Sequence, residues 1–148
     1  MKNKYKYIKI ILLIVLLINN KVFSQEVKIK YIVENKPITS TDIKNEINYL
    51  LLINNKLSEL NNDLLVEYAA KSLLREKIKE IQLKKNFQFG QNEELINERV
   101  KNFRESLNIN DETGFNDLLE KLNLSRNLIN KKIELEVLWN NLIYEKFI

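Results

Sequence analysis

The sequence has 148 residues, 30% charged and 45% hydrophobic, a balance typical of one folded domain rather than a disordered chain. It contains no Cys and no His, which excludes a disulfide framework, a His-based catalytic triad and zinc or haem ligation by this chain alone. The formal charge of +4 comes from the first 24 residues, which hold five lysines and no acid, and the rest has 19 Lys and Arg against 20 Asp and Glu. That near-neutral remainder argues against nucleic acid as a partner.

The first 24 residues have the pattern of a secretory signal peptide. Residues 1–9 are basic, residues 10–18 are continuously apolar, and Val22 and Ser24 suit the −3 and −1 positions of a cleavage site. The apolar run is about half the ~20 residues that span a bilayer. We therefore expect export to the periplasm, cleavage after Ser24, and a single mature domain over residues 25–148 without stable membrane insertion. An uncleaved N-terminal anchor is the alternative.

The mature chain begins with a predicted β-hairpin. Residues 27–33 alternate between apolar and mostly polar positions, as a half-buried strand does, and a turn is expected at residues 34–36. Residues 37–39 predict a short second strand, where Pro37 is tolerated because an edge position needs no N–H donor.

Five helices are predicted after the hairpin. The first has Thr39, Ser40 and Thr41 as possible N-caps and ends near Asn54. The others cover residues 63–85, 91–107, 115–122 and 126–145, the last with Ser125 as its cap. Gly90 is expected to end the second helix, and Gly114 to form the turn between the third and fourth. The last helix is apolar on more than one side, so it either lies centrally or keeps a face for a partner. The predicted apolar side of the second helix consists of Leu64, Tyr68, Ala69, Leu73, Leu74, Ile78 and Ile81. The fold expected is mainly α, with a short N-terminal β-hairpin.

The order of these features resembles the N-terminal chaperone domain of the SurA family, periplasmic foldases of Gram-negative bacteria. The family shares an apolar strand, an Asn-containing turn, an Ile-Thr strand and a Ser/Thr-Asp/Glu helix start, and later an apolar-x-apolar element before an acidic helix start. Here these are Tyr31-Ile32-Val33, Asn35, Ile38-Thr39, Thr41-Asp42-Ile43, Phe87-Gln88-Phe89 and Asn92-Glu93-Glu94-Leu95. In the family a parvulin isomerase domain follows, and since none follows here before Ile148, isomerase activity is not expected.

The resemblance implies an ATP-independent, non-enzymatic chaperone that binds unfolded outer-membrane protein segments. Such segments alternate apolar and aromatic residues. Side chains off the main apolar stripes are the candidates for peptide binding: Tyr49, Leu52, Ile53, Trp139 and Tyr144. The alternative is an assembly subunit or adaptor whose apolar groove is filled by a partner chain or by a second copy, which would make a homo-oligomer.

No catalytic, cofactor or metal site is predicted. Asn108, Asn110 and Glu112 have the spacing of a calcium loop, but Thr113 occupies the position that requires glycine and Leu119 the position that requires glutamate. Lysines near Phe87 and Phe89 alternate with glutamates, which is typical of a solvated helix face rather than of a nucleic-acid site.

Overall fold

The computed structural model describes residues 28–147, so the predicted signal peptide and Val27 lie outside the described residues. Within that range the fold is mainly helical, with five α-helices and a two-stranded antiparallel hairpin, as the sequence predicts, and it also contains one short 3-10 helix. The elements are β1 (Ile29–Val33), β2 (Lys36–Thr39), α2 (Ser40–Ile53), η1 (Asn55–Glu59), α3 (Asn62–Leu83), α4 (Glu93–Ser106), α5 (Glu112–Lys121) and α6 (Arg126–Phe147).

The hairpin closes through a two-residue turn. Glu34 and Asn35 both have positive φ, 43° and 65°, which a two-residue type I′ turn requires. Val33 therefore pairs directly with Lys36, and Lys36 belongs to β2 rather than to the predicted turn. The register is irregular between Ile29 and Tyr31. Tyr31 and Ile32, which lie on the two faces of the strand, are both exposed, so the half-buried alternation expected for this strand is not observed at these two residues.

A capping box joins the hairpin to α2. The Thr39 hydroxyl accepts a hydrogen bond from the Asp42 backbone N–H at 3.2 Å, and the Asp42 carboxylate accepts one from the Thr39 backbone N–H at 2.8 Å. These two bonds satisfy donors that would otherwise be orphaned at the helix start. The chain thus turns from strand to helix within one residue, and Ile38 and Ile43 both enter the first core cluster.

The buried face of α3 agrees with the predicted one at Ala69 and Leu73 and differs from it elsewhere. Leu64, Tyr68 and Ile78 are about half exposed, whereas the buried apolar residues of the helix are Leu65, Ala69, Ala70, Leu73 and Leu83. The helix carries apolar residues over a wide arc, so periodicity alone permits either face. The small Ala69 and Ala70 side chains let α2 approach closely, and this selects the face that is buried.

Both glycine assignments were wrong in detail. α3 ends at Leu83, seven residues before Gly90, and Gly90 instead takes a positive φ of 83° in the connection to α4. Gly114 lies inside α5, whose N-cap is Asp111, because the Asp111 carboxylate accepts the Gly114 backbone N–H at 2.8 Å and starts the helix earlier. The 3-10 helix η1 was not predicted.

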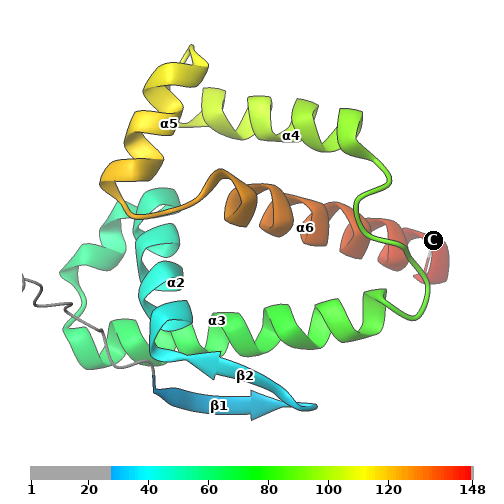
Figure 1. The fold of residues 1–148 in the computed structure, drawn as a ribbon, viewed down its shortest axis with the longest axis horizontal. Coiled ribbons are helices and arrows are strands. Elements are labelled where there is room, and N and C mark those ends of the chain that lie inside the picture. The colour runs from blue at the N-terminus through cyan, green and yellow to red at the C-terminus, as the bar shows by residue number, and fades with distance from the viewer. Residues whose placement is uncertain (1–27, 148) are drawn as a thin grey trace, which may run out of the picture.

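α6 lies in the middle of the fold, between α3 and α4 (Figure 1). The hairpin packs beneath α2 and α3, and α5 joins α4 to the start of α6 at one end. Three core clusters result, one between the hairpin, α2 and α3, one joining α4, α5 and the first half of α6, and one around the second half of α6. The central position expected as one alternative for the last helix is therefore the one observed.

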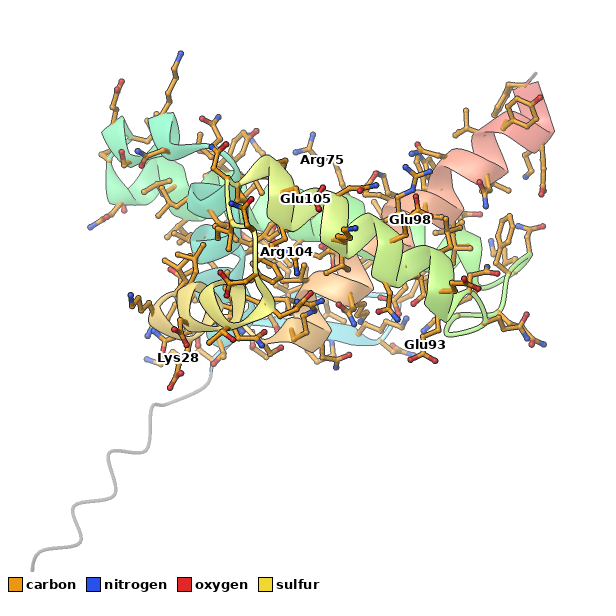
Figure 2. All side chains as sticks on the ribbon, turned by 90° about the horizontal axis from the view of Figure 1, so that it is seen from above. Lys28, Arg75, Glu93, Glu98, Arg104 and Glu105 are labelled. Atoms are coloured by element: carbon orange, nitrogen blue, oxygen red, sulfur yellow. The ribbon has the colours of Figure 1, made fainter. Side chains whose placement is uncertain are left out.

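The last turns of α6 stand away from α4 when the molecule is seen from above (Figure 2). Tyr144 and Phe147 in these turns are 65% and 75% exposed. No helix among residues 28–147 is long and apolar enough to cross a membrane.

Candidate functional site

A buried ion-pair network fixes α6 against α2 and α3. The Lys132 ammonium donates to Glu46 of α2 at 2.5 Å and also to Glu76 of α3, and it lies 4.5 Å from the centre of the Tyr49 ring. Lys132 and Glu46 are 6% and 1% exposed. Burial lowers the pKa of Lys132, but the two carboxylates outweigh it and raise the pKa above its usual range, so the side chain stays charged.

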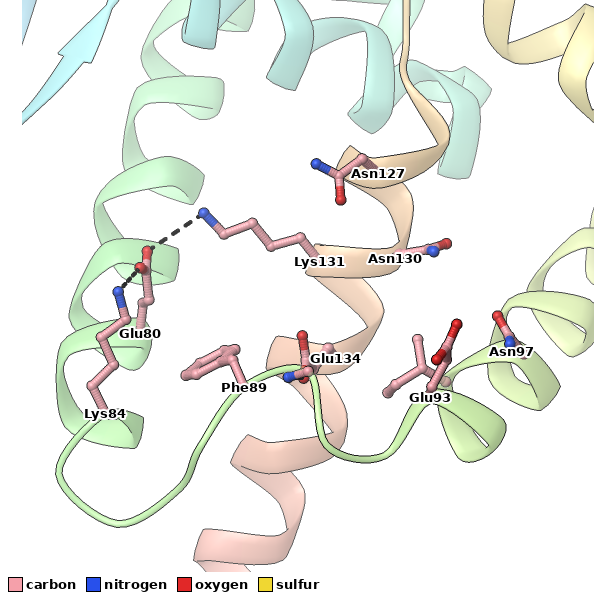
Figure 3. Close-up of a pocket in the computed structure, with 11 residues that line it drawn as sticks. Glu80, Lys84, Phe89, Glu93, Asn97, Asn127, Asn130, Lys131 and Glu134 are labelled. Atoms are coloured by element: carbon pink, nitrogen blue, oxygen red, sulfur yellow. Dashed lines mark hydrogen bonds and ion pairs between the residues drawn. The ribbon is translucent and has the colours of Figure 1, made fainter.

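An open cleft of about 500 Å³ lies between α3, α4 and α6, and Tyr49 is not among the residues that line it. Figure 3 shows its three walls: Glu80 and Lys84 on α3, Glu93 and Asn97 on α4, and four polar residues on α6. Its volume is in the range that pockets for small molecules or a few peptide residues have.

Three asparagines give the cleft its hydrogen-bonding character. Asn127 and Asn130 come from successive turns of α6 and Asn97 comes from α4. In Figure 3 the Asn127 amide points toward the α3 side of the cleft and the Asn130 amide toward the α4 side. Each amide has both donors and an acceptor, which is the combination that pairs with a peptide main chain. The Asn130 Oδ1 atom is buried and has no hydrogen-bond partner among the described residues.

Glu80 organises one end of the cleft. Its carboxylate lies 2.7 Å from the Lys84 ammonium and 3.1 Å from the Lys36 ammonium of β2, with Lys77 and Lys131 within 4.0 Å. Burial raises the pKa of this carboxyl, but the hydrogen bonds from Lys84 and Lys36 and the two other lysines lower it to about 2. The hairpin, α3 and α6 therefore meet at a single carboxylate.

The apolar part of the cleft comes from Phe89 and Ile96. Phe89 packs against the third core cluster and Ile96 belongs to the second, so the cleft lies over the junction of the two. The Lys84 ammonium lies 6.0 Å from the centre of the Phe89 ring. Apolar surface beside unsatisfied amide groups is the arrangement that holds an extended chain through side-chain and main-chain contacts together.

Two smaller hollows lie on the other side of α6, about 340 and 400 Å³ in volume. Both are lined by Tyr49, Lys132 and Glu136, and Glu136 is paired with Lys79 at 2.7 Å. Their lining groups pair with one another, which makes them a less suitable surface for a ligand than the cleft.

The structure does not gather the five predicted peptide-binding residues into one site. Tyr49 and Leu52 pack against the second core cluster, and Trp139 packs against the third. Ile53 and Tyr144 are 46% and 65% exposed, but they lie at the ends of α2 and α6, which point to different parts of the molecule (Figure 1). None of the five lines the cleft.

Sequence reasoning missed the cleft residues because their types are ordinary on a helix surface. The available signal was on α6, where Asn127 and Asn130, three residues apart, share a polar helix face with Lys131 and Glu134. The part contributed by α3 and α4 depends on how the helices pack, which no local pattern encodes.

No group of acidic side chains in residues 28–147 is arranged to hold a metal ion. Comparison of the chain with protein-family models, with curated proteins and with solved structures gives no match. The resemblance to the SurA N-terminal domain therefore stays a prediction that rests on the order of the sequence features.

Proposed function

We propose that this protein is a periplasmic, non-enzymatic chaperone that holds short extended segments of unfolded outer-membrane proteins without ATP. The observation that carries the proposal is the open cleft between α3, α4 and α6, whose lining includes three asparagines together with Phe89 and Ile96. Unfolded β-barrel strands present unpaired main-chain groups and alternating apolar side chains, and both parts of the cleft suit them. Periplasmic location rests on the predicted signal peptide.

The exposed apolar side chains outside the cleft support the same proposal. Leu64, Tyr68 and Ile78 of α3 lie on one helix face at offsets of 0, 4 and 14 residues and are each about half exposed. Surface of this kind adds weak, sequence-tolerant contacts for a long client that passes beyond the cleft.

The test is suppression of aggregation. The protein, purified after export, is mixed at equal molar ratio with an outer-membrane β-barrel diluted from urea, and light scattering is followed with time. We expect slower aggregation that does not depend on added ATP. Aggregation at the rate seen with serum albumin at the same concentration would rule the proposal out.

A second candidate function, an assembly subunit, is favoured by the end of α6. Tyr144 and Phe147 stand exposed on the turns that leave the body of the molecule. Sedimentation equilibrium separates the two functions, since a tight complex with a second copy, together with no effect on client aggregation, would favour the subunit.

A further inference from the structure

The two outer edges of the hairpin are not equivalent. The sheet has only two strands among the described residues, so β1 and β2 each have one edge without a partner strand. Pro37 lies in β2 and has no backbone N–H, so that edge cannot offer a full set of donors to a further strand. β1 contains no proline, and Figure 1 shows it on the outer side of the hairpin, away from α2.

The turn fixes which backbone groups of β1 point outward. In a two-residue hairpin the residues that flank the turn, here Val33 and Lys36, form a hydrogen-bonded pair. Pairs alternate along an antiparallel ladder, so Ile32 and Pro37 form the next, non-hydrogen-bonded pair. The missing N–H of Pro37 agrees with this assignment. The N–H and C=O of Ile32 are therefore directed to the free edge of β1.

The side chains around this edge leave it open. Ile32 is 65% exposed, and Tyr31, on the opposite face of the strand, is 45% exposed. Lys30, two residues before Ile32 on the same strand, is also exposed. A strand placed beside β1 would thus meet an apolar side chain next to a positive charge.

We propose that β1 adds an extended segment of a client polypeptide as a third strand, anchored on the N–H and C=O of Ile32. The client segment would carry an apolar residue beside Ile32 and an acidic residue near Lys30, because opposite charges on neighbouring strands are favourable. The kind of partner rests on the proposed chaperone function. The Lys36–Glu80 ion pair at 3.1 Å joins the hairpin to the rim of the cleft.

A second copy of the chain fits this edge less well than a free extended segment. Antiparallel pairing of two β1 strands about Ile32 would set the turn at Glu34 and Asn35 of each copy against the irregular register near Lys30 of the other. The shared ladder would be limited to a few residues. A flexible segment has no such turn and can follow the full edge.

The test uses a fluorescent, end-capped peptide of ten residues that alternates valine and threonine, with one central glutamate, and measures binding by anisotropy. Ile32→Pro removes the outward N–H and keeps the pairing with β2, so we expect peptide affinity to fall about tenfold. Ile32→Thr keeps the N–H and is the matched control, with an expected loss below threefold. Equal affinity of wild type and Ile32→Pro would overturn the proposal.

Lys30→Glu provides an independent readout if Ile32→Pro loses its circular dichroism spectrum. This variant should prefer the same peptide with a central lysine, whereas the wild type prefers the glutamate peptide, and an unchanged preference would overturn the proposal. A wild-type dimer that Ile32→Pro converts to monomer would show that a second copy occupies the edge, and would also overturn the proposal.

The aggregation assay separates this inference from the chaperone proposal. If wild type and Ile32→Pro suppress client aggregation equally, the edge inference fails while the chaperone proposal stands. If the wild type itself fails to suppress aggregation, the chaperone proposal fails.

Discussion

Lys132 and Glu46 form an ion pair of 2.5 Å although the two residues are 86 positions apart and almost fully buried. Their pairing, together with the bond from Lys132 to Glu76, holds the central helix α6 against α2 and α3. Since α6 supplies one wall of the cleft, this network sets the position of Asn127 and Asn130.

Lys132→Met should destabilise the protein by about 3–5 kcal/mol, because it leaves Glu46 as an uncompensated charge in the core. The double variant Glu46→Leu/Lys132→Met removes both charges and should regain most of that loss. Chemical denaturation of the wild type, the two single variants and the double variant measures the coupling. Additive losses would show that the two residues do not act as a pair.

Glu80→Gln should reduce stability by about 1–3 kcal/mol near neutral pH, because it removes charge-assisted hydrogen bonds from Lys84 and Lys36. The folded-state pKa of Glu80 is depressed to about 2 from an ordinary 4.5, so its contribution is complete above pH 4.5 and is lost as the pH falls toward 2. Urea unfolding at pH 6 and pH 2.5 should show that the free energies of unfolding of wild type and variant differ less at pH 2.5 than at pH 6. A difference that stays constant would contradict this role.

Gly114→Ala should stabilise the protein by about 0.5–1 kcal/mol. Gly114 lies in the first turn of α5, and a Cβ atom there would meet its nearest neighbours at 3.5 Å, an ordinary contact distance. Gly90→Ala is the contrasting change, because a φ of 83° strains any residue with a Cβ atom, and we expect it to cost about 1 kcal/mol. Thermal unfolding of both variants measures the change in Tm relative to wild type, which should be positive for Gly114→Ala and negative for Gly90→Ala.

Thr39→Ala should cost about 1 kcal/mol by removing the N-cap of α2. Ser125→Ala removes a comparable bond from the start of α6, where the Ser125 hydroxyl accepts the Leu128 N–H at 3.1 Å, and should cost a similar amount. Denaturant midpoints of the two variants provide the check. No loss in Thr39→Ala would mean that the capping box does not stabilise the strand-to-helix corner.

The sequence predicts those parts of the fold that depend on local chemistry. The turn at Glu34 and Asn35 lies within the expected residues 34–36, Thr39 is one of the three N-caps predicted for α2, and Ser125 caps α6 as predicted. The predicted apolar face of α3 was wrong at Leu64 because Leu64 and Leu65 fit a helical stripe equally well, and only the packing of α2 distinguishes them. Sequence rules for turns and caps involve residues that are close in the chain. They do not determine which side of a helix is buried.

The candidate site was less predictable than the fold for the same physical reason. The burial of Lys132 depends on Glu46 and Glu76, which are far away in sequence, and a lysine on a helix is otherwise expected in water. The cleft combines Asn97 with Asn127 and Asn130 from a helix that follows it by more than twenty residues. Sequence patterns could show that α6 is apolar on more than one side, but they could not locate the polar cleft beside it.

The most direct test of the proposed function is to block the cleft and leave the rest of the surface unchanged. Asn127→Trp places a large side chain in the cleft, and Asn116→Trp makes the same change at an exposed position of α5 outside it. Both variants are compared with the wild type in the aggregation assay with an unfolded outer-membrane β-barrel, after circular dichroism has shown that they fold. We expect Asn127→Trp to lose most of the suppression and Asn116→Trp to retain it. Full suppression by Asn127→Trp would contradict the assignment of the cleft as the client site.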